Sequence, residues 1–134
     1  MLNRNSSLRS LEDVLDAPFA AAVPCMHEAL FSDKGFAEGF STLDVAKALI
    51  DEGFHPMTVY FPLVVHGAML VEPTETESKA ALDQFIGALR RIAERARAGD
   101  LSLKAAPVEA PRRRLDETLA ARRPRLVWTE PGPA

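Results

Sequence analysis

The chain has 134 residues with a formal net charge of −3, and 47% of its residues are hydrophobic while 26% are charged. This length suits one domain with a hydrophobic core, and the ordinary composition excludes wholesale disorder. The lone Cys25 excludes an internal disulfide, no secretory leader opens the chain, and no apolar run reaches the about 20 residues that span a bilayer. We therefore expect a cytoplasmic protein without a membrane segment.

Basic residues gather at the C-terminal end, whereas acidic residues spread over the middle of the chain. The tail arginines are Arg112, Arg113, Arg114, Arg122, Arg123 and Arg125. A nucleic-acid interface would interleave aromatic residues with such cations, and this tail lacks that pattern. We predict a solvated or interface-facing tail and no binding to nucleic acid.

The first predicted element is a helix over residues 7–17. Leu8, Leu11 and Leu15 recur at the spacing of one helical face. Pro18 would end this helix because proline cannot continue it.

A strand is predicted next, after a linker over residues 19–24. Residues 25–31 (CMHEALF) alternate in a period of two, which is compatible with a strand. Residues 32–39 (SDKGFAEG) are rich in glycine and charge, and this composition indicates a turn or a loop.

The second predicted helix begins after Ser41, the expected N-cap, with Asp44 as a weak version of the capping-box acid. Gly53 is placed to adopt the left-handed conformation that ends a helix. The predicted buried face consists of Leu43, Ala46, Leu49 and Ile50.

Two short strands are predicted at residues 57–61 (MTVYF) and 67–72 (GAMLVE). Both are rich in β-branched, aromatic and apolar residues, and prolines and glycine bound them. The connection between them is short enough for a β-hairpin.

The longest predicted helix covers residues 76–98 and ends before Gly99. Its apolar stripe contains Leu82, Phe85, Ile86, Leu89, Ile92 and Ala96. We expect this stripe to cover the sheet. Beyond Gly99, prolines divide the tail into short pieces, with one or two helical turns at residues 115–122 and an exposed apolar cluster at residues 126–128.

Three segments resemble the C-terminal domain of the glycine-decarboxylating P-protein of the glycine cleavage system, most closely that of subunit 2 in the two-subunit bacterial form. They are GFHPMTVYFPLVVHGAMLVEPTETES at 53–78, CMHEALF at 25–31 and RRLDETLAARRPRLVW at 113–128. The chain departs from the family at His66, where the family usually carries proline.

The resemblance implies an α+β two-layer sandwich like the small C-terminal domain of fold-type I pyridoxal-phosphate enzymes, in the order strand, helix, strand, strand, helix. We divide the chain into an N-terminal helix and linker at residues 1–24, a compact α+β domain at 25–99, and a proline- and arginine-rich tail at 100–134.

The resemblance also implies that this chain is a fragment of a pyridoxal-phosphate enzyme. Such an enzyme needs a lysine, a phosphate cradle and a carboxylate for the cofactor, and the family supplies them from its large domain. The chain's lysines are Lys34, Lys47, Lys79 and Lys104, and they match no cofactor-binding motif. We expect no catalytic residue and no bound cofactor in this chain alone, and no glycine decarboxylation by it.

Polar residues that interrupt the apolar strands are the candidates for lining a cleft. They are His27, Glu28, His55, Glu72, Thr74 and Glu75. Each also has an ordinary interpretation, as a strand-face residue, a loop residue before proline, or an acid at a helix N-terminus. The histidines show no metal-ligand spacing, and Cys25 shows no activating neighbours, so neither a metal site nor a nucleophile is predicted.

The leading hypothesis is therefore a cleft-closing and assembly-supporting domain. Its expected partners are the large domain of its own subunit, P-protein subunit 1 and, through the intact enzyme, the lipoyl H-protein. The alternative is an independent protein-binding or assembly module derived from that domain, which would use the apolar tail.

Overall fold

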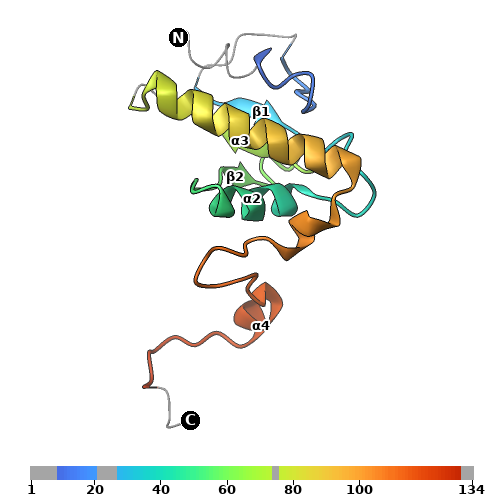
Figure 1. The fold of residues 1–134 in the computed structure, drawn as a ribbon. Helices are drawn as coiled ribbons and strands as arrows, with labels where there is room; N and C mark the ends of the chain where they lie inside the picture. Colours follow the sequence, from blue (N-terminus) through green and yellow to red (C-terminus); the bar gives the residue numbers. More distant parts are fainter. Residues whose placement is uncertain (1–8, 21–26, 74–75, 131–134) are drawn as a thin grey trace.

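The computed structural model describes residues 9–20, 27–73 and 76–130 (Figure 1). Its elements are β1 (Ala29–Phe31), α2 (Thr42–Asp51), β2 (Thr58–Val59), β3 (Met69–Val71), α3 (Lys79–Ala98), the 3-10 helix η1 (Leu101–Ala105) and α4 (Glu117–Arg122). The long helix α3 passes across the small sheet and contacts α2, while α4 lies away from this body (Figure 1). The chain is thus a small α+β fold.

The sheet has three strands in the order β1-β3-β2, and both pairings are antiparallel. Ala29 pairs with Val71 and Phe31 pairs with Met69, and all four side chains are buried. Because alternate residues of a strand point to one face, these four form the face that the helices cover. The predicted hairpin is confirmed, although its strands are shorter than residues 57–61 and 67–72.

Helix α3 confirms the predicted apolar stripe. Leu82, Leu89 and Ile92 are buried, and Phe85 and Ile86 pack against the core. The helix begins later than predicted, because the Ser78 hydroxyl accepts the Ala81 N–H and caps it. It ends at Gly99, which adopts the left-handed conformation with φ 73°.

Helix α2 begins after Ser41 as predicted, and the Ser41 N–H donates to the Asp44 carboxylate at 2.9 Å. Its buried face differs from the prediction. The buried residues are Thr42, Asp44, Val45, Ala46, Ala48 and Leu49, whereas Leu43 and Ile50 are half-buried. The face is rotated because Thr42 and Asp44 form buried polar contacts that hydrophobic periodicity does not report.

Within its described part, the predicted helix over residues 7–17 is confirmed only at Arg9 and was wrong beyond it. The chain forms turns from Ser10 to Val14, and Asp16 makes an isolated bridge to Ser32. Leu11 and Leu15 are still buried in the core. Their spacing therefore reported burial correctly, but tertiary contacts with Ser32 end any helix early. Leu8 lies outside the described residues.

The predicted strand over residues 25–31 is real only from Ala29 onward in the described chain, and residues 25 and 26 lie outside it. The predicted loop at residues 32–39 and the short helix near residues 115–122 are both confirmed.

The segment after α3 first packs on the domain and then leaves it. Leu103 of η1 and Ala106 are buried in the core, although they follow the predicted domain end at residue 99. Asp51 then accepts the backbone N–H groups of Val108 and Glu109 at 2.8–2.9 Å. Within the described chain, none of the residues of α4 is buried.

A buried carboxylate fastens this segment to the start of α2. Asp44 is only 1% exposed, and it contacts the Lys104 ammonium at 2.6 Å and the Arg114 guanidinium at 2.8 Å. Burial opposes the charged form, but the hydrogen bonds from Lys104, Arg114 and the Ser41 N–H outweigh it and lower the pKa of Asp44. This cluster ties three sequence-distant segments together.

None of the described helices is both long enough and apolar enough to cross a membrane.

Candidate binding pocket

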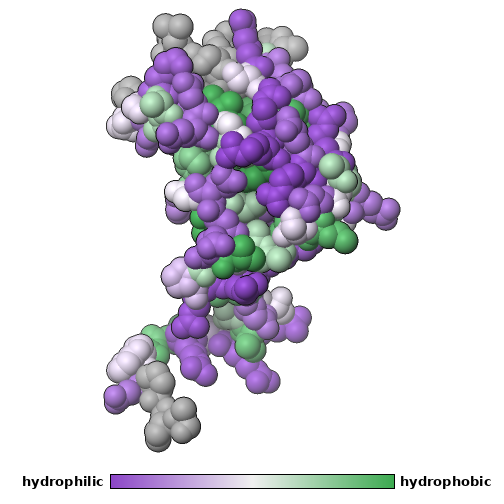
Figure 2. All heavy atoms as spheres, in the orientation of Figure 1, coloured by the Kyte–Doolittle hydropathy of each residue, from purple (hydrophilic) through white to green (hydrophobic). Residues whose placement is uncertain are grey.

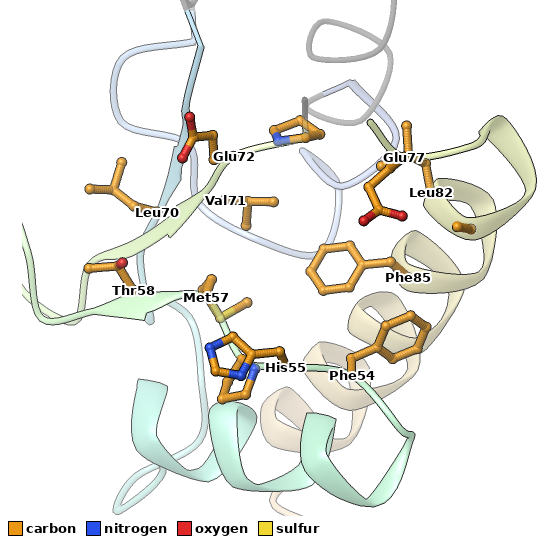
Figure 3. Close-up of a pocket in the computed structure, with 13 residues that line it drawn as sticks. Phe54, His55, Met57, Thr58, Leu70, Val71, Glu72, Glu77, Leu82 and Phe85 are labelled. Atoms are coloured by element: carbon orange, nitrogen blue, oxygen red, sulfur yellow. The ribbon is translucent and has the colours of Figure 1, made fainter. Parts of the chain in front are cut away.

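A pocket of about 420 Å³ lies between the hairpin and the first half of α3 (Figure 3). Three stretches of chain line it. They contribute Phe54, His55, Pro56, Met57 and Thr58 before and in β2, Leu70, Val71, Glu72 and Pro73 at β3, and Glu77, Ala81, Leu82 and Phe85 around α3. The volume lies within the range of small-molecule sites.

The inner wall of the pocket is apolar. The rings of Phe54 and Phe85 meet edge to face, with 5.4 Å between their centroids. Met57 and Val71 lie near Phe85 (Figure 3). Helical periodicity places Phe85 here, and the left-handed Gly53 turns the chain after α2 so that Phe54 reaches it.

Polar groups stand at the edge of this apolar wall. Glu77 points into the hollow from the segment just before α3, Glu72 follows β3, and His55 lies beside Met57 (Figure 3). Within the described residues, neither Glu72 nor Glu77 has an ion pair or a side-chain hydrogen bond. Their carboxylates are therefore available as acceptors for an external donor or cation.

The structure brings together two of the residues selected from the sequence, His55 and Glu72. Thr74 and Glu75, selected with them, lie outside the described residues.

The other two selected residues lie elsewhere. His27 and Glu28 are not among the pocket residues, and the His27 side chain is 63% exposed with its Nε2 atom 3.9 Å from Glu28. They form an exposed pair rather than part of this pocket.

Sequence reasoning missed the pocket role of Glu77 and of the two phenylalanines. The sequence predicts Phe85 only as part of an apolar stripe, and neither Glu77 nor Phe54 is among the residues selected as candidates for lining a cleft. Glu77 lies in the 53–78 motif and Phe85 lies in α3, and neither position by itself indicates a pocket. Only the antiparallel hairpin and the crossing α3 bring them to one hollow.

The chain's four lysines are all described, and none of them lines the pocket. Lys79 pairs with Asp83 at 2.5 Å, and Lys104 donates to Asp44 and to the Gly39 carbonyl oxygen. Lys47 lines a smaller hollow beside Arg114, at the start of α4. Lys34 is 82% exposed near Asp16.

A metal site is not formed by the described residues, because no three of their His, Cys, Asp or Glu side chains come together. The pocket's chemistry is that of a partly apolar slot with carboxylates and an imidazole at its edge. It can exclude water from one side of a bound group and accept hydrogen bonds from that group's polar end.

The fold and the pocket define the class of this chain: it is a small α+β domain that provides one wall of a binding pocket. The sequence over residues 1–110 matches the family model described as "Glycine dehydrogenase, C-terminal domain". The chain belongs to this family, which confirms the resemblance found in the sequence.

The curated proteins to which the chain is similar share the same name. The chain is 62% identical over 130 residues to the probable glycine dehydrogenase (decarboxylating) subunit 2 of Caulobacter vibrioides. It is 45% identical over 130 residues to the protein so described in Desulforamulus reducens, and 49% identical over 123 residues to that of Caldanaerobacter subterraneus. These matches cover 90–96% of this chain but only 25–26% of each relative, so the chain spans about a quarter of their length.

Proposed function

We propose that this chain acts as the C-terminal domain of a pyridoxal-phosphate-dependent glycine dehydrogenase of the glycine cleavage system, and that it closes the cofactor cleft. The observation that carries the proposal is the family match over residues 1–110 together with near-complete coverage by subunit 2 relatives. In this proposal the chain corresponds to the small domain of a fold-type I enzyme.

The residues of this chain do not fit the cofactor itself. Holding pyridoxal phosphate requires a lysine in the site, and the four lysines of this chain pair elsewhere or lie outside the pocket. The large domain of the same enzyme is the proposed source of that lysine, and this chain alone is proposed to be inactive.

In the proposed reaction, glycine loses its carboxylate as carbon dioxide and its aminomethyl group passes to the lipoyl arm of the H-protein. The contribution of this chain is a wall. Phe54 and Phe85 exclude water, while His55, Glu72 and Glu77 accept or donate hydrogen bonds at the edge. Thr74 and Glu75, which lie outside the described residues, stay proposed cleft-lining residues.

The proposed partners follow from this role. They are the large domain of its own subunit, P-protein subunit 1 and, through the intact enzyme, the lipoyl H-protein, all in the cytoplasm. Neither nucleic acid nor a membrane has a place in this proposal.

A chimera tests the proposed function. In it, the residues of the Caulobacter vibrioides subunit 2 that match this chain are replaced by this chain, and subunit 1, H-protein and pyridoxal phosphate are supplied. We expect glycine-dependent release of carbon dioxide from the chimera and none from the same subunit without its C-terminal quarter. An inactive but folded chimera that binds subunit 1 would contradict the proposal.

One observation favours the second candidate, an independent protein-binding module. Leu126, Val127 and Trp128 are 74–88% exposed beyond α4. Such a module would bind a protein through this tail without restoring decarboxylation, so the same chimera separates the two functions.

A further inference from the structure

The connection between β2 and β3 exposes large apolar side chains. Within residues 60–64, here called the apolar loop, Phe61 is 58%, Leu63 is 87% and Val64 is 84% exposed. Tyr60 is also half-exposed. Scattered exposed apolar residues are common, but adjacent ones on one loop mark an interaction surface.

Hydrogen bonds fix the apolar loop at both ends. The Tyr60 N–H donates to the Ala68 carbonyl oxygen at 2.8 Å, and the Val65 N–H donates to that of Pro62 at 3.1 Å. A loop that is already ordered loses less conformational entropy on binding, so its apolar area is available for affinity.

Contacts with other segments also fix the residues that follow the apolar loop, His66 and Gly67. The buried Thr42 hydroxyl of α2 donates to the Gly67 carbonyl oxygen at 2.6 Å. Gly67 adopts φ +58°, and a Cβ atom there would meet the Asp33 carboxyl group at 2.0 Å. Asp33 also pairs with the exposed His66 at 3.1 Å. Side chains from two other segments therefore hold the loop's position.

The outer face of α3 has the opposite character. Hydrophilic residues cover the side of the molecule on which α3 lies in front (Figure 2). Arg90 pairs with Asp13 at 2.7 Å, and Arg91 pairs with Glu52 at 2.7 Å. A partner that buried this face would have to break these ion pairs and desolvate the charges. Burying the apolar loop requires neither step.

The size of the relatives indicates what covers the loop. The 130 matched residues are 25% of the Caulobacter vibrioides protein, which leaves the other 75% of that polypeptide outside this chain. A covalently joined segment is present at high effective concentration, which favours the remainder of that polypeptide over a separate protein as the occupant of the loop.

We propose that the apolar loop is the surface by which this domain docks on the remainder of the glycine dehydrogenase subunit 2 polypeptide, an inference that rests on the proposed function. The hairpin that contains the apolar loop also forms part of the pocket, because Thr58 of β2 and Leu70 of β3 both line the pocket. Docking through the loop consequently sets the position of the pocket wall.

The chimera described above, with a protease site at its junction, tests this docking. After cleavage, size-exclusion chromatography measures whether the two fragments stay together without the covalent link. The test variant is Leu63→Glu with Val64→Glu. The matched control is Leu126→Glu with Val127→Glu, which places the same two charges on the other exposed apolar cluster.

We expect the fragments of the unmodified chimera and of the control to co-elute after cleavage. The loop variant should separate, with a dissociation constant raised at least about tenfold, which corresponds to about 1.4 kcal/mol. Both substituted pairs are exposed, and unchanged thermal unfolding of each uncleaved variant would show that the fold is intact.

The docking proposal is overturned when the two fragments of the loop variant co-elute as well as those of the unmodified chimera, whether or not the fragments of the control separate. It is also overturned when the two fragments of the unmodified chimera separate. Carbon dioxide release by the uncleaved, unmodified chimera is recorded in parallel. An active chimera with a non-docking loop rejects this inference alone, while an inactive but folded chimera that binds subunit 1 rejects the proposed function.

Discussion

Two groups of acidic residues behave in opposite ways in this fold. Asp44 is buried, and it binds Lys104, Arg114 and the Ser41 N–H. Glu72 and Glu77 stand at the edge of the pocket, and no ion pair links either of them to another described residue.

The difference separates carboxylates that hold the fold from carboxylates that remain free to bind something else. Removing Asp44 would leave two cations without their partner, which is costly in a buried site. The Glu72 side chain makes no ion pair or hydrogen bond with another described residue, so its substitution should leave the stability of the fold unchanged. Stability measurements can therefore distinguish the two groups without knowledge of the ligand.

The largest expected effect is that of Asp44→Asn. The substitution removes the charge that Lys104 and Arg114 share, and we expect the free energy of unfolding to fall by about 3 kcal/mol in urea denaturation. The control is Asp116→Asn at the N-cap of the exposed α4, where asparagine caps as well as aspartate and the change should stay below about 0.5 kcal/mol. Equal effects of the two substitutions would refute the role of Asp44 as an anchor.

A smaller loss is expected from Thr42→Val, which keeps the shape but removes the hydroxyl that donates to Gly67. The carbonyl oxygen of Gly67 loses its buried partner, so the free energy of unfolding should fall by about 2 kcal/mol. Thr118→Val on the exposed α4 is the control, with a change within about 0.5 kcal/mol. Faster hydrogen exchange at the Tyr60 N–H in the Thr42 variant would link this loss to the loop.

Acid should weaken the fold in a defined window. Hydrogen bonds from Ser102 and Arg95 lower the pKa of Asp100 from 3.8 to about 2, and the pKa of Asp44 is lowered as well. A depressed pKa in the folded state gives stability that is present above the unfolded pKa and is lost as pH falls toward the folded value. The free energy of unfolding should therefore decrease between about pH 4 and pH 2.

The Asp44→Asn variant provides the comparison for this acid effect. Its slope of stability against pH should be shallower in the same window, because one of the contributing carboxylates is gone. An unchanged slope, measured by urea denaturation at each pH, would show that Asp44 does not contribute.

The smallest expected effect on stability is that of Glu72→Gln. We expect a change within about 0.5 kcal/mol, because the exposed carboxylate has no ion pair with another described residue. In the active chimera, however, the same substitution should lower the rate of carbon dioxide release at least about tenfold. A destabilised variant, or one with full activity, would remove Glu72 from the proposed cleft.

Much of the fold was predictable because local signals and burial agree. Ser41, Gly53 and Gly99 mark helix ends by conformational preference, and the stripe of α3 follows from hydrophobic spacing alone. The failures occur where tertiary contacts override local pattern. Leu11 and Leu15 are buried without a continuous helix, because the bridge between Asp16 and Ser32 fixes the chain there.

The candidate site was predictable only in part. His55 and Glu72 were recognised because polar residues interrupt apolar segments, and both line the pocket. Phe54 and Phe85 were not, since an aromatic residue that lines a pocket has the same sequence pattern as one in a core.

The sequence by itself determined the family, the hairpin and the two main helices, because motif wording, helix-terminating glycines and apolar periodicity are local properties. Only the tertiary structure decided that Lys104 and Arg114 share Asp44, that Thr42 holds Gly67, and that one hollow joins His55, Glu72 and Glu77. These contacts join residues from separate elements, and the balance of burial and hydrogen bonding that selects them exists only once those elements have packed.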